Sequence, residues 1–155
     1  MSTNAAILIK HRTGTAQAIY CHSDGMFEGV GRCLQEHYQD PEKVKALIAL
    51  GAISRLEARV APNEGEAHSF KNPAKGVTVA YVRDRGDSPK ERTTHSYNSL
   101  DEALQDWNGI VPYLYVFDEE EGQWYGNTGS GLRQDIDDGQ TFALTPLVLM
   151  VHEEE

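Results

Sequence analysis

Strand-like and helix-like segments follow one another along this chain without a regular alternation. The predicted order is two strands, two helices, a strand with an edge strand, a third helix and a group of closing strands. Because strand–helix–strand repeats are missing, this order favours an α+β fold with a mostly antiparallel sheet. We expect one domain over residues 1–155, two or three helices packed on one face of the sheet, and a flexible tail at residues 152–155.

The strand predictions rest on short runs of apolar, β-branched or aromatic residues. Two such runs, Ala5–Lys10 and Ala16–Cys21, flank a turn that contains Gly14, which predicts a β-hairpin. Residues 76–82 (GVTVAYV) and residues 111–117 (VPYLYVF) predict two further strands.

Helix boundaries are marked by capping residues. Apolar residues at spacings of three and four predict a helix over residues 27–38. Asp40 followed by Pro41 is typical of a second helix start, and Gly51 suits its end. Ser99 and Glu102 have the spacing of a capping box and predict a third helix.

Size and composition limit the class of protein. The chain has 155 residues, of which 39% are hydrophobic and 25% charged, as in ordinary globular domains. No apolar run has the roughly 18 residues that a membrane span needs. Cys21 and Cys33 are too few for a disulfide framework and suit a reducing compartment, so the predicted location is the cytoplasm.

Negative charge is concentrated in the last third of the chain. Residues 101–155 contain 13 acidic residues and one basic residue, Arg133, whereas residues 1–100 contain 11 acidic and 13 basic residues. The net charge of −10 argues against direct nucleic-acid binding, because the polyanion repels each further carboxylate. The uneven distribution creates a directional field that favours a positively charged partner.

Cysteine and histidine residues gather near residues 20–38. Cys21, His22, Cys33 and His37 offer the two thiolates and two imidazoles of a zinc site. Adjacent Cys21 and His22, however, point to opposite sides if the strand continues through them.

Two other interpretations of this block do not involve a metal. Asp24 could orient His22 as the base of a Cys21 nucleophile. Alternatively the block is architectural, with Asp24 and Gly25 turning the chain into the helix and Gly25 at positive φ. We favour the architectural interpretation, so no metal, no cofactor and no enzymatic activity are predicted.

Acidic clusters lie close in sequence to aromatic residues in the C-terminal third. A surface of this composition is typical of one that docks into a basic groove. The residues predicted to contact a partner are Asp118, Glu119, Glu120, Glu121, Asp135, Asp137, Asp138, Tyr113, Tyr115 and Trp124.

One part of the chain has a pattern of its own. A Tyr-Cys-His-x-Asp-Gly turn at residues 20–25 is followed by Glu-Gly-Val-Gly at residues 28–31, His-Tyr at residues 37–38 and Lys-Val-x-x-Leu-Ile-x-Leu-Gly at residues 43–51. In this pattern the chain resembles a family of small proteins from tailed bacteriophages and prophages. The resemblance implies a phage origin and action in the host cytoplasm, and phages often encode small acidic proteins that block host defences, CRISPR–Cas inhibitors among them.

Together these observations predict a non-catalytic inhibitor of a host antiviral system that handles nucleic acid, such as a CRISPR–Cas effector or a nuclease. The predicted partner is a host defence protein or ribonucleoprotein with a basic groove, which the acidic surface would enter as a mimic of nucleic acid. The protein is not predicted to bind nucleic acid or a membrane directly. The sequence leaves open whether it forms a homodimer.

Two alternatives remain from the sequence. The first is a small-molecule sponge for a nucleotide signal, with phosphates held by basic residues and bases stacked on tyrosines; its candidates are Lys43, Lys45, Arg55, Arg59, Arg83, Arg85, Arg92, Tyr20, Tyr38 and Tyr81. The second is a metal-dependent enzyme that uses Cys21, His22, Asp24 and His37.

Overall fold

Strand β1 (Ala5–Lys10) lies at the centre of the sheet. The computed structural model describes residues 3–107, 109–128 and 145–146. β1 pairs antiparallel with β2 (Ala16–Cys21), which confirms the predicted hairpin. On its other side β1 pairs parallel with β6 (Tyr113–Asp118), so that Lys10 lies opposite Asp118.

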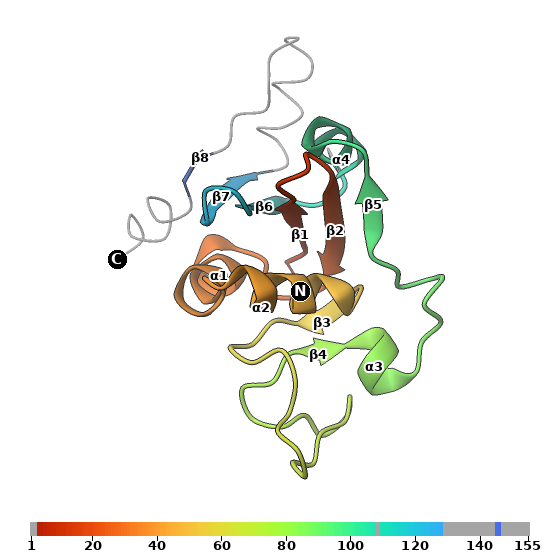
Figure 1. Ribbon diagram of the computed structural model, residues 1–155. Coiled ribbons are helices and arrows are strands. Elements are labelled where there is room, and N and C mark those ends of the chain that lie inside the picture. The colour runs from red at the N-terminus through yellow and green to blue at the C-terminus, as the bar shows by residue number, and fades with distance from the viewer. Residues whose placement is uncertain (1–2, 108, 129–144, 147–155) are drawn as a thin grey trace.

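The remaining strands extend this core in both directions (Figure 1). They are β3 (Ile53–Arg55), β4 (Val79–Ala80), β5 (His95–Tyr97), β7 (Gln123–Thr128) and β8 (Thr145–Pro146). The order is β4-β3-β2-β1-β6-β7-β8, and β5 pairs with β2 beside this path. Among the pairings between these strands, β1–β6 and β2–β3 are parallel and the others are antiparallel. The α+β class is therefore confirmed, with a mixed sheet that is mostly antiparallel.

Helices cover both faces of the sheet, whereas the sequence predicted one. The helical segments are η1 (Phe27–Gly31, a π-helix), α1 (Arg32–His37), α2 (Pro41–Ala49), α3 (Tyr81–Arg85) and α4 (Leu100–Trp107). Ile7 and Ile9 of β1 pack in one core cluster with α1 and α2, and Ala6 and Leu8 pack in a second cluster with α4. Because β1 is apolar on both sides, each side needs its own cover.

Capping residues set the helix starts as predicted. Oδ1 of Asp40 accepts a hydrogen bond of 3.0 Å from the amide of Glu42 at the start of α2. At the start of α4, the Ser99 hydroxyl accepts one of 3.1 Å from the amide of Glu102. The Glu102 carboxylate accepts the amide of Asn98, the residue before Ser99, at 3.3 Å, so the two side chains cap the helix in a variant of the predicted capping box.

The predicted strand at residues 76–82 is much shorter in the structure. Pairing is limited to Val79 and Ala80, and Tyr81 begins α3. The carboxylate of Asp84 accepts the amide of Ala80 at 2.8 Å and so favours a helical turn at this point. A local contact four residues ahead therefore ends the strand, although the sequence pattern would continue it.

The turn into η1 also differs from the prediction. Asp24, with φ of 57°, adopts the left-handed conformation that was predicted for Gly25. Gly25 is needed for another reason, since a Cβ at this position would lie 2.6 Å from the carbonyl oxygen of Asn4. The turn is architectural, as expected, but its two residues have different roles.

We expect Gly51→Ala to destabilise the protein by more than about 1 kcal/mol. Gly51 ends α2 with φ of 77°, and an added Cβ would lie 2.2 Å from the carbonyl oxygen of Arg92. Urea denaturation followed by circular dichroism measures the loss. Gly65→Ala is the matched control for positive φ without a clash, because φ there is 81° and no atom lies within 4 Å. Equal losses in both variants would contradict the role of the Arg92 contact.

Candidate functional site

The acidic turn between β6 and β7 is largely engaged in contacts with the protein itself. Asp118 Oδ1 accepts the amides of Glu120 and Glu121 at 3.0 and 3.1 Å, and Asp118 Oδ2 lies 3.8 Å from Lys10. The Tyr125 hydroxyl donates a hydrogen bond of 2.5 Å to Glu121. Glu120 is exposed at the tip of the turn. The turn is therefore ordered by its own carboxylates.

Glu119 is an internal ion-pair residue. It is 9% exposed, and its carboxylate lies 2.6 Å from the Lys45 ammonium of α2 and accepts the amide of Arg12 at 3.0 Å. These contacts lower the pKa of Glu119, with Lys45 as the largest cause. The prediction that Glu119 contacts a partner is not supported, because its carboxylate is already paired with Lys45 of α2 and with the amide of Arg12 in the β1–β2 turn.

Two of the three predicted aromatic contacts lie in the core. Tyr115 is fully buried and donates to the carbonyl of Gly25 at 2.6 Å. Trp124 is 2% exposed and donates from Nε1 to the carbonyl of Tyr38 at 2.8 Å. Tyr113 is partly buried and packs edge-to-face on Phe27. The prediction that Tyr115 and Trp124 contact a partner is therefore contradicted by their burial.

The fold brings two separate acidic segments to one end of the sheet. Since β1 and β6 are parallel and in register, the β1–β2 turn and the β6–β7 turn lie side by side, and the amide of Glu119 donates to the carbonyl of Lys10 at 3.0 Å. Leu100, at the start of α4, lines a small pocket together with Asp118 and Glu121. This places the first turn of α4 beside the acidic turn.

We call this group of carboxylates the acidic end. Its members are Asp101, Glu102, Asp118, Glu120 and Glu121. Cations also lie nearby: Lys10 at the end of β1, the exposed Arg12 on the β1–β2 turn, and Lys45 of α2, which pairs with Glu119. α4 lies at the opposite end of the molecule from α3 and β4 (Figure 1), so its first turn is distant from the arginines of α3. The predicted contacts Asp135, Asp137 and Asp138, and the tail at residues 152–155, lie outside the described residues.

The Cys–His block does not assemble into a reactive site. Cys21 is buried in the core and its thiol contacts the carbonyl of Ser23, whereas His22 and His37 are exposed. Burial raises the pKa of Cys21 and of Cys33 to about 12, so both remain protonated thiols at neutral pH. Within residues 3–107 and 109–128, no group of three Cys, His, Asp or Glu side chains is placed to hold a metal ion.

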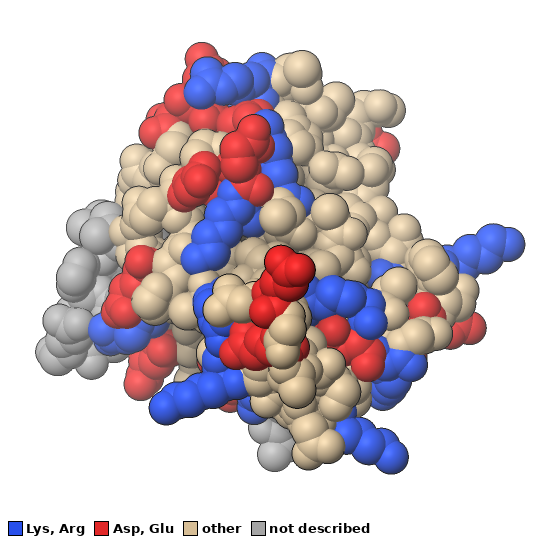
Figure 2. Space-filling model, turned by 60° about the horizontal axis from the view of Figure 1, so that its bottom comes forward, with Lys and Arg blue, Asp and Glu red and all other residues tan. Residues whose placement is uncertain are grey.

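The cations proposed for phosphate binding are paired within the protein. The pairs are Arg55–Glu57, Arg59–Glu66, Arg83–Asp84, Arg85–Asp87, Arg92–Asp87, Lys45–Glu119, and Lys43 with the carbonyls of His37 and Ala58. Figure 2 shows this interleaving of basic and acidic side chains on the face near α3. A phosphate would have to displace a carboxylate from each arginine and from Lys45, and backbone carbonyls from Lys43, so the nucleotide-sponge alternative gains no support.

Arginines in this region also pack on aromatic rings. The guanidinium of Arg85 lies 4.7 Å from the ring centres of both Phe70 and Tyr81, and that of Arg92 lies 4.3 Å from Tyr81. Hydrogen bonds from Arg85 hold the pKa of Asp87 at about 2, so this carboxylate stays charged beside them. The cluster therefore holds the segment after α3 against the loop that carries Phe70.

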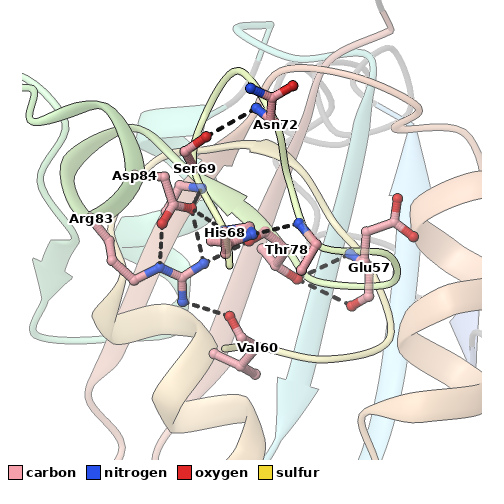
Figure 3. Close-up of polar contacts among 10 residues, drawn as sticks. Glu57, Val60, His68, Ser69, Asn72, Thr78, Arg83 and Asp84 are labelled. Atoms are coloured by element: carbon pink, nitrogen blue, oxygen red, sulfur yellow. Dashed lines mark hydrogen bonds and ion pairs between the residues drawn. The ribbon is translucent and has the colours of Figure 1, made fainter. Parts of the chain in front are cut away.

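A buried pair that the sequence did not suggest anchors the long loop before β4 (Figure 3). His68 Nε2 lies 3.0 Å from Asp84 Oδ2, and the two side chains are 3% and 4% exposed. His68 Nδ1 accepts the amide of Ala74 at 2.9 Å, which leaves the proton on Nε2. Nothing in the spacing of His68 and Asp84 marks them as partners. Since both are buried, they stabilise the loop and do not meet a substrate.

We compared the chain with protein-family models, with curated proteins and with solved structures, and none of them matches it. Among the described residues, no helix combines the length and apolar character required to cross a bilayer. The resemblance to phage proteins stays a hypothesis that rests on residues 20–51.

Proposed function

We propose that the chain is a phage-encoded, non-catalytic inhibitor that acts in the host cytoplasm on an antiviral system handling nucleic acid. Its acidic end would enter the positively charged channel of a CRISPR–Cas effector or a nuclease, in place of nucleic acid. The partner is thus a basic protein or ribonucleoprotein complex, and the inhibitor needs no cofactor.

One observation carries this proposal. Two acidic segments, about twenty residues apart in the sequence, meet at one end of the molecule through the parallel pairing of β1 with β6 and the position of α4. Glu120 and Asp101 are exposed there, so both carboxylates are accessible to a partner. Clustered carboxylates on a rigid scaffold attract a basic groove over long range and accelerate association at low salt.

The decisive experiment measures inhibition of purified effector ribonucleoproteins binding their target DNA. We expect inhibition that weakens as salt rises, because screening shortens the range of the field. In the double variant Asp101→Lys/Glu120→Lys, the concentration for half-inhibition should rise about tenfold, since two attractive charges become repulsive. Neither substitution touches Glu119, so the ion pair with Lys45 remains.

The matched control is Glu64→Lys/Glu91→Lys. Both residues are exposed acids in the near-neutral part of the chain, so the net charge changes equally at a site remote from the acidic end. Equal loss of inhibition in the two double variants would show a general charge effect and remove the acidic end from the mechanism. Failure to capture any basic effector or nuclease at low salt would overturn the proposed function.

A further inference from the structure

A pocket opens beside the acidic end, where the β1–β2 turn, the end of β5 and the first turn of α4 meet. Its volume is about 450 Å³, within the range of small-molecule sites. The side chains that matter for its chemistry are His11, Gln17, Ser96, Tyr97, Asn98 and Glu102. None of these residues was singled out as a ligand contact by the sequence, because they come from three segments that are distant along the chain.

One wall of the pocket is held in place by a chain of polar contacts. His11 Nε2 lies 2.8 Å from Gln17 Oε1, and Gln17 Nε2 donates to the Ser96 hydroxyl at 3.4 Å. Behind this wall, His11 Nδ1 lies 3.8 Å from Glu119, which Lys45 fixes from α2. Side chains that are oriented by a second layer of contacts bind a ligand with little loss of conformational entropy.

The opposite wall presents groups that still have hydrogen-bonding capacity. The backbone amide of Asn98 donates a hydrogen bond of 3.3 Å to one carboxylate oxygen of Glu102. Within the described part of the chain, no hydrogen-bond partner occupies the Asn98 carboxamide or the second oxygen of Glu102. Tyr97 donates its hydroxyl to Asp106 at 2.6 Å, which fixes the orientation of its ring at the pocket. This wall therefore combines an amide, a carboxylate oxygen and an aromatic ring.

We propose that this pocket binds a neutral polyhydroxylated ring, such as a monosaccharide. Hydroxyl groups both donate and accept, so they match the Asn98 carboxamide and the second oxygen of Glu102, beside the wall that Gln17 orders. The ring of Tyr97 offers an apolar surface for the C–H groups of the sugar. A phosphorylated or carboxylated ligand does not fit, because Glu102 and the neighbouring Asp106 would repel it.

The test is a titration of the protein with one compound at a time, in which the NMR chemical shifts of the backbone amides are recorded. The probes are glucose, galactose, N-acetylglucosamine, ribose and adenosine. We expect at least one probe to shift the amides of residues 15–17 and 96–102 in a saturable way. Asn98→Ala should weaken that binding at least about tenfold, since it removes two hydrogen-bonding groups at once. Asn72→Ala is the matched control, because Asn72 is an exposed asparagine in the distant loop before β4.

A further variant separates a neutral ligand from a cationic one. Glu102→Gln keeps the cap of α4 and an oxygen acceptor but removes the charge. We expect sugar binding to persist in this variant, whereas binding of an amine such as spermidine would be lost. The proposal is overturned if no probe shifts these amides, if Asn98→Ala binds like the unmodified chain, or if an amine binds where no sugar does. Glu102 also belongs to the acidic end, so Asn98→Ala is the variant that tests the pocket alone, and inhibition is measured separately.

Discussion

Replacing Trp124 by alanine is expected to lower the free energy of unfolding by about 3–5 kcal/mol. Trp124 is 2% exposed and lies opposite Phe117 on the neighbouring strand, with ring centres 5.1 Å apart. Its Nε1 donates to the Tyr38 carbonyl that follows α1. The truncation would leave a large cavity between the sheet and α1 and an unpaired carbonyl. Urea denaturation at neutral pH measures the loss.

Trp124→Phe is the control that keeps an aromatic ring and removes the hydrogen bond. We expect a smaller loss of about 1–2 kcal/mol for this variant, because most of the packing remains. If Trp124→Ala unfolded at the same urea concentration as the unmodified chain but no longer inhibited an effector, Trp124 would be a contact residue after all. Its assignment to the core would then be wrong.

Asp84→Ala should be the second large effect, with a loss of about 3 kcal/mol. Asp84 is 4% exposed and accepts hydrogen bonds from Arg83 at 2.8 and 2.9 Å and from the amide of Ala80 at 2.8 Å. The variant also removes the carboxylate oxygen that lies 3.0 Å from Nε2 of the buried His68. The partial exposure of Arg83 moderates the loss, since water can solvate the freed guanidinium. Asp84→Asn keeps an acceptor and should lose less.

The contribution of Asp84 also depends on pH. Burial alone would raise the pKa of Asp84, but the hydrogen bonds from Arg83 and Ala80 and the contact with His68 outweigh it and lower the pKa. A lowered carboxyl pKa stabilises the folded state above the unfolded pKa of about 3.9, and this stability is lost as pH falls through the folded value. The difference in unfolding free energy between the unmodified chain and Asp84→Asn should therefore shrink below about pH 4. A constant difference down to pH 2 would contradict this account.

Local signals in the sequence predicted local structure well. Asp40, Ser99 and Glu102 act on amides within three or four residues, so their capping roles are visible from spacing alone. The hairpin of β1 and β2 likewise depends on two apolar runs and a short turn between them. In these cases the residues that interact are close in sequence, and the physical rule needs no knowledge of the rest of the chain.

Contacts between distant segments account for what was missed. The parallel pairing of β1 with β6 has no turn to mark it, and the cover on both faces follows from that pairing and the path of α4. The sequence grouped Glu119 with its acidic neighbours, but its environment is set by Lys45 from α2 and by Arg12. Tyr115 and Trp124 illustrate the same difficulty, because an aromatic residue suits both a core and an interface, and burial decides between them.

The position of β6 has a consequence for how the chain matures during synthesis. Ala5 pairs with Tyr113, so β1 cannot form its pairing with β6 until about a hundred more residues have been translated. Until β6 leaves the ribosome, one edge of β1 and its apolar side chains stay uncovered, and nonlocal pairing of this kind folds slowly. We expect the nascent hairpin to depend on chaperones in this interval, and a chain truncated before Tyr113 to aggregate.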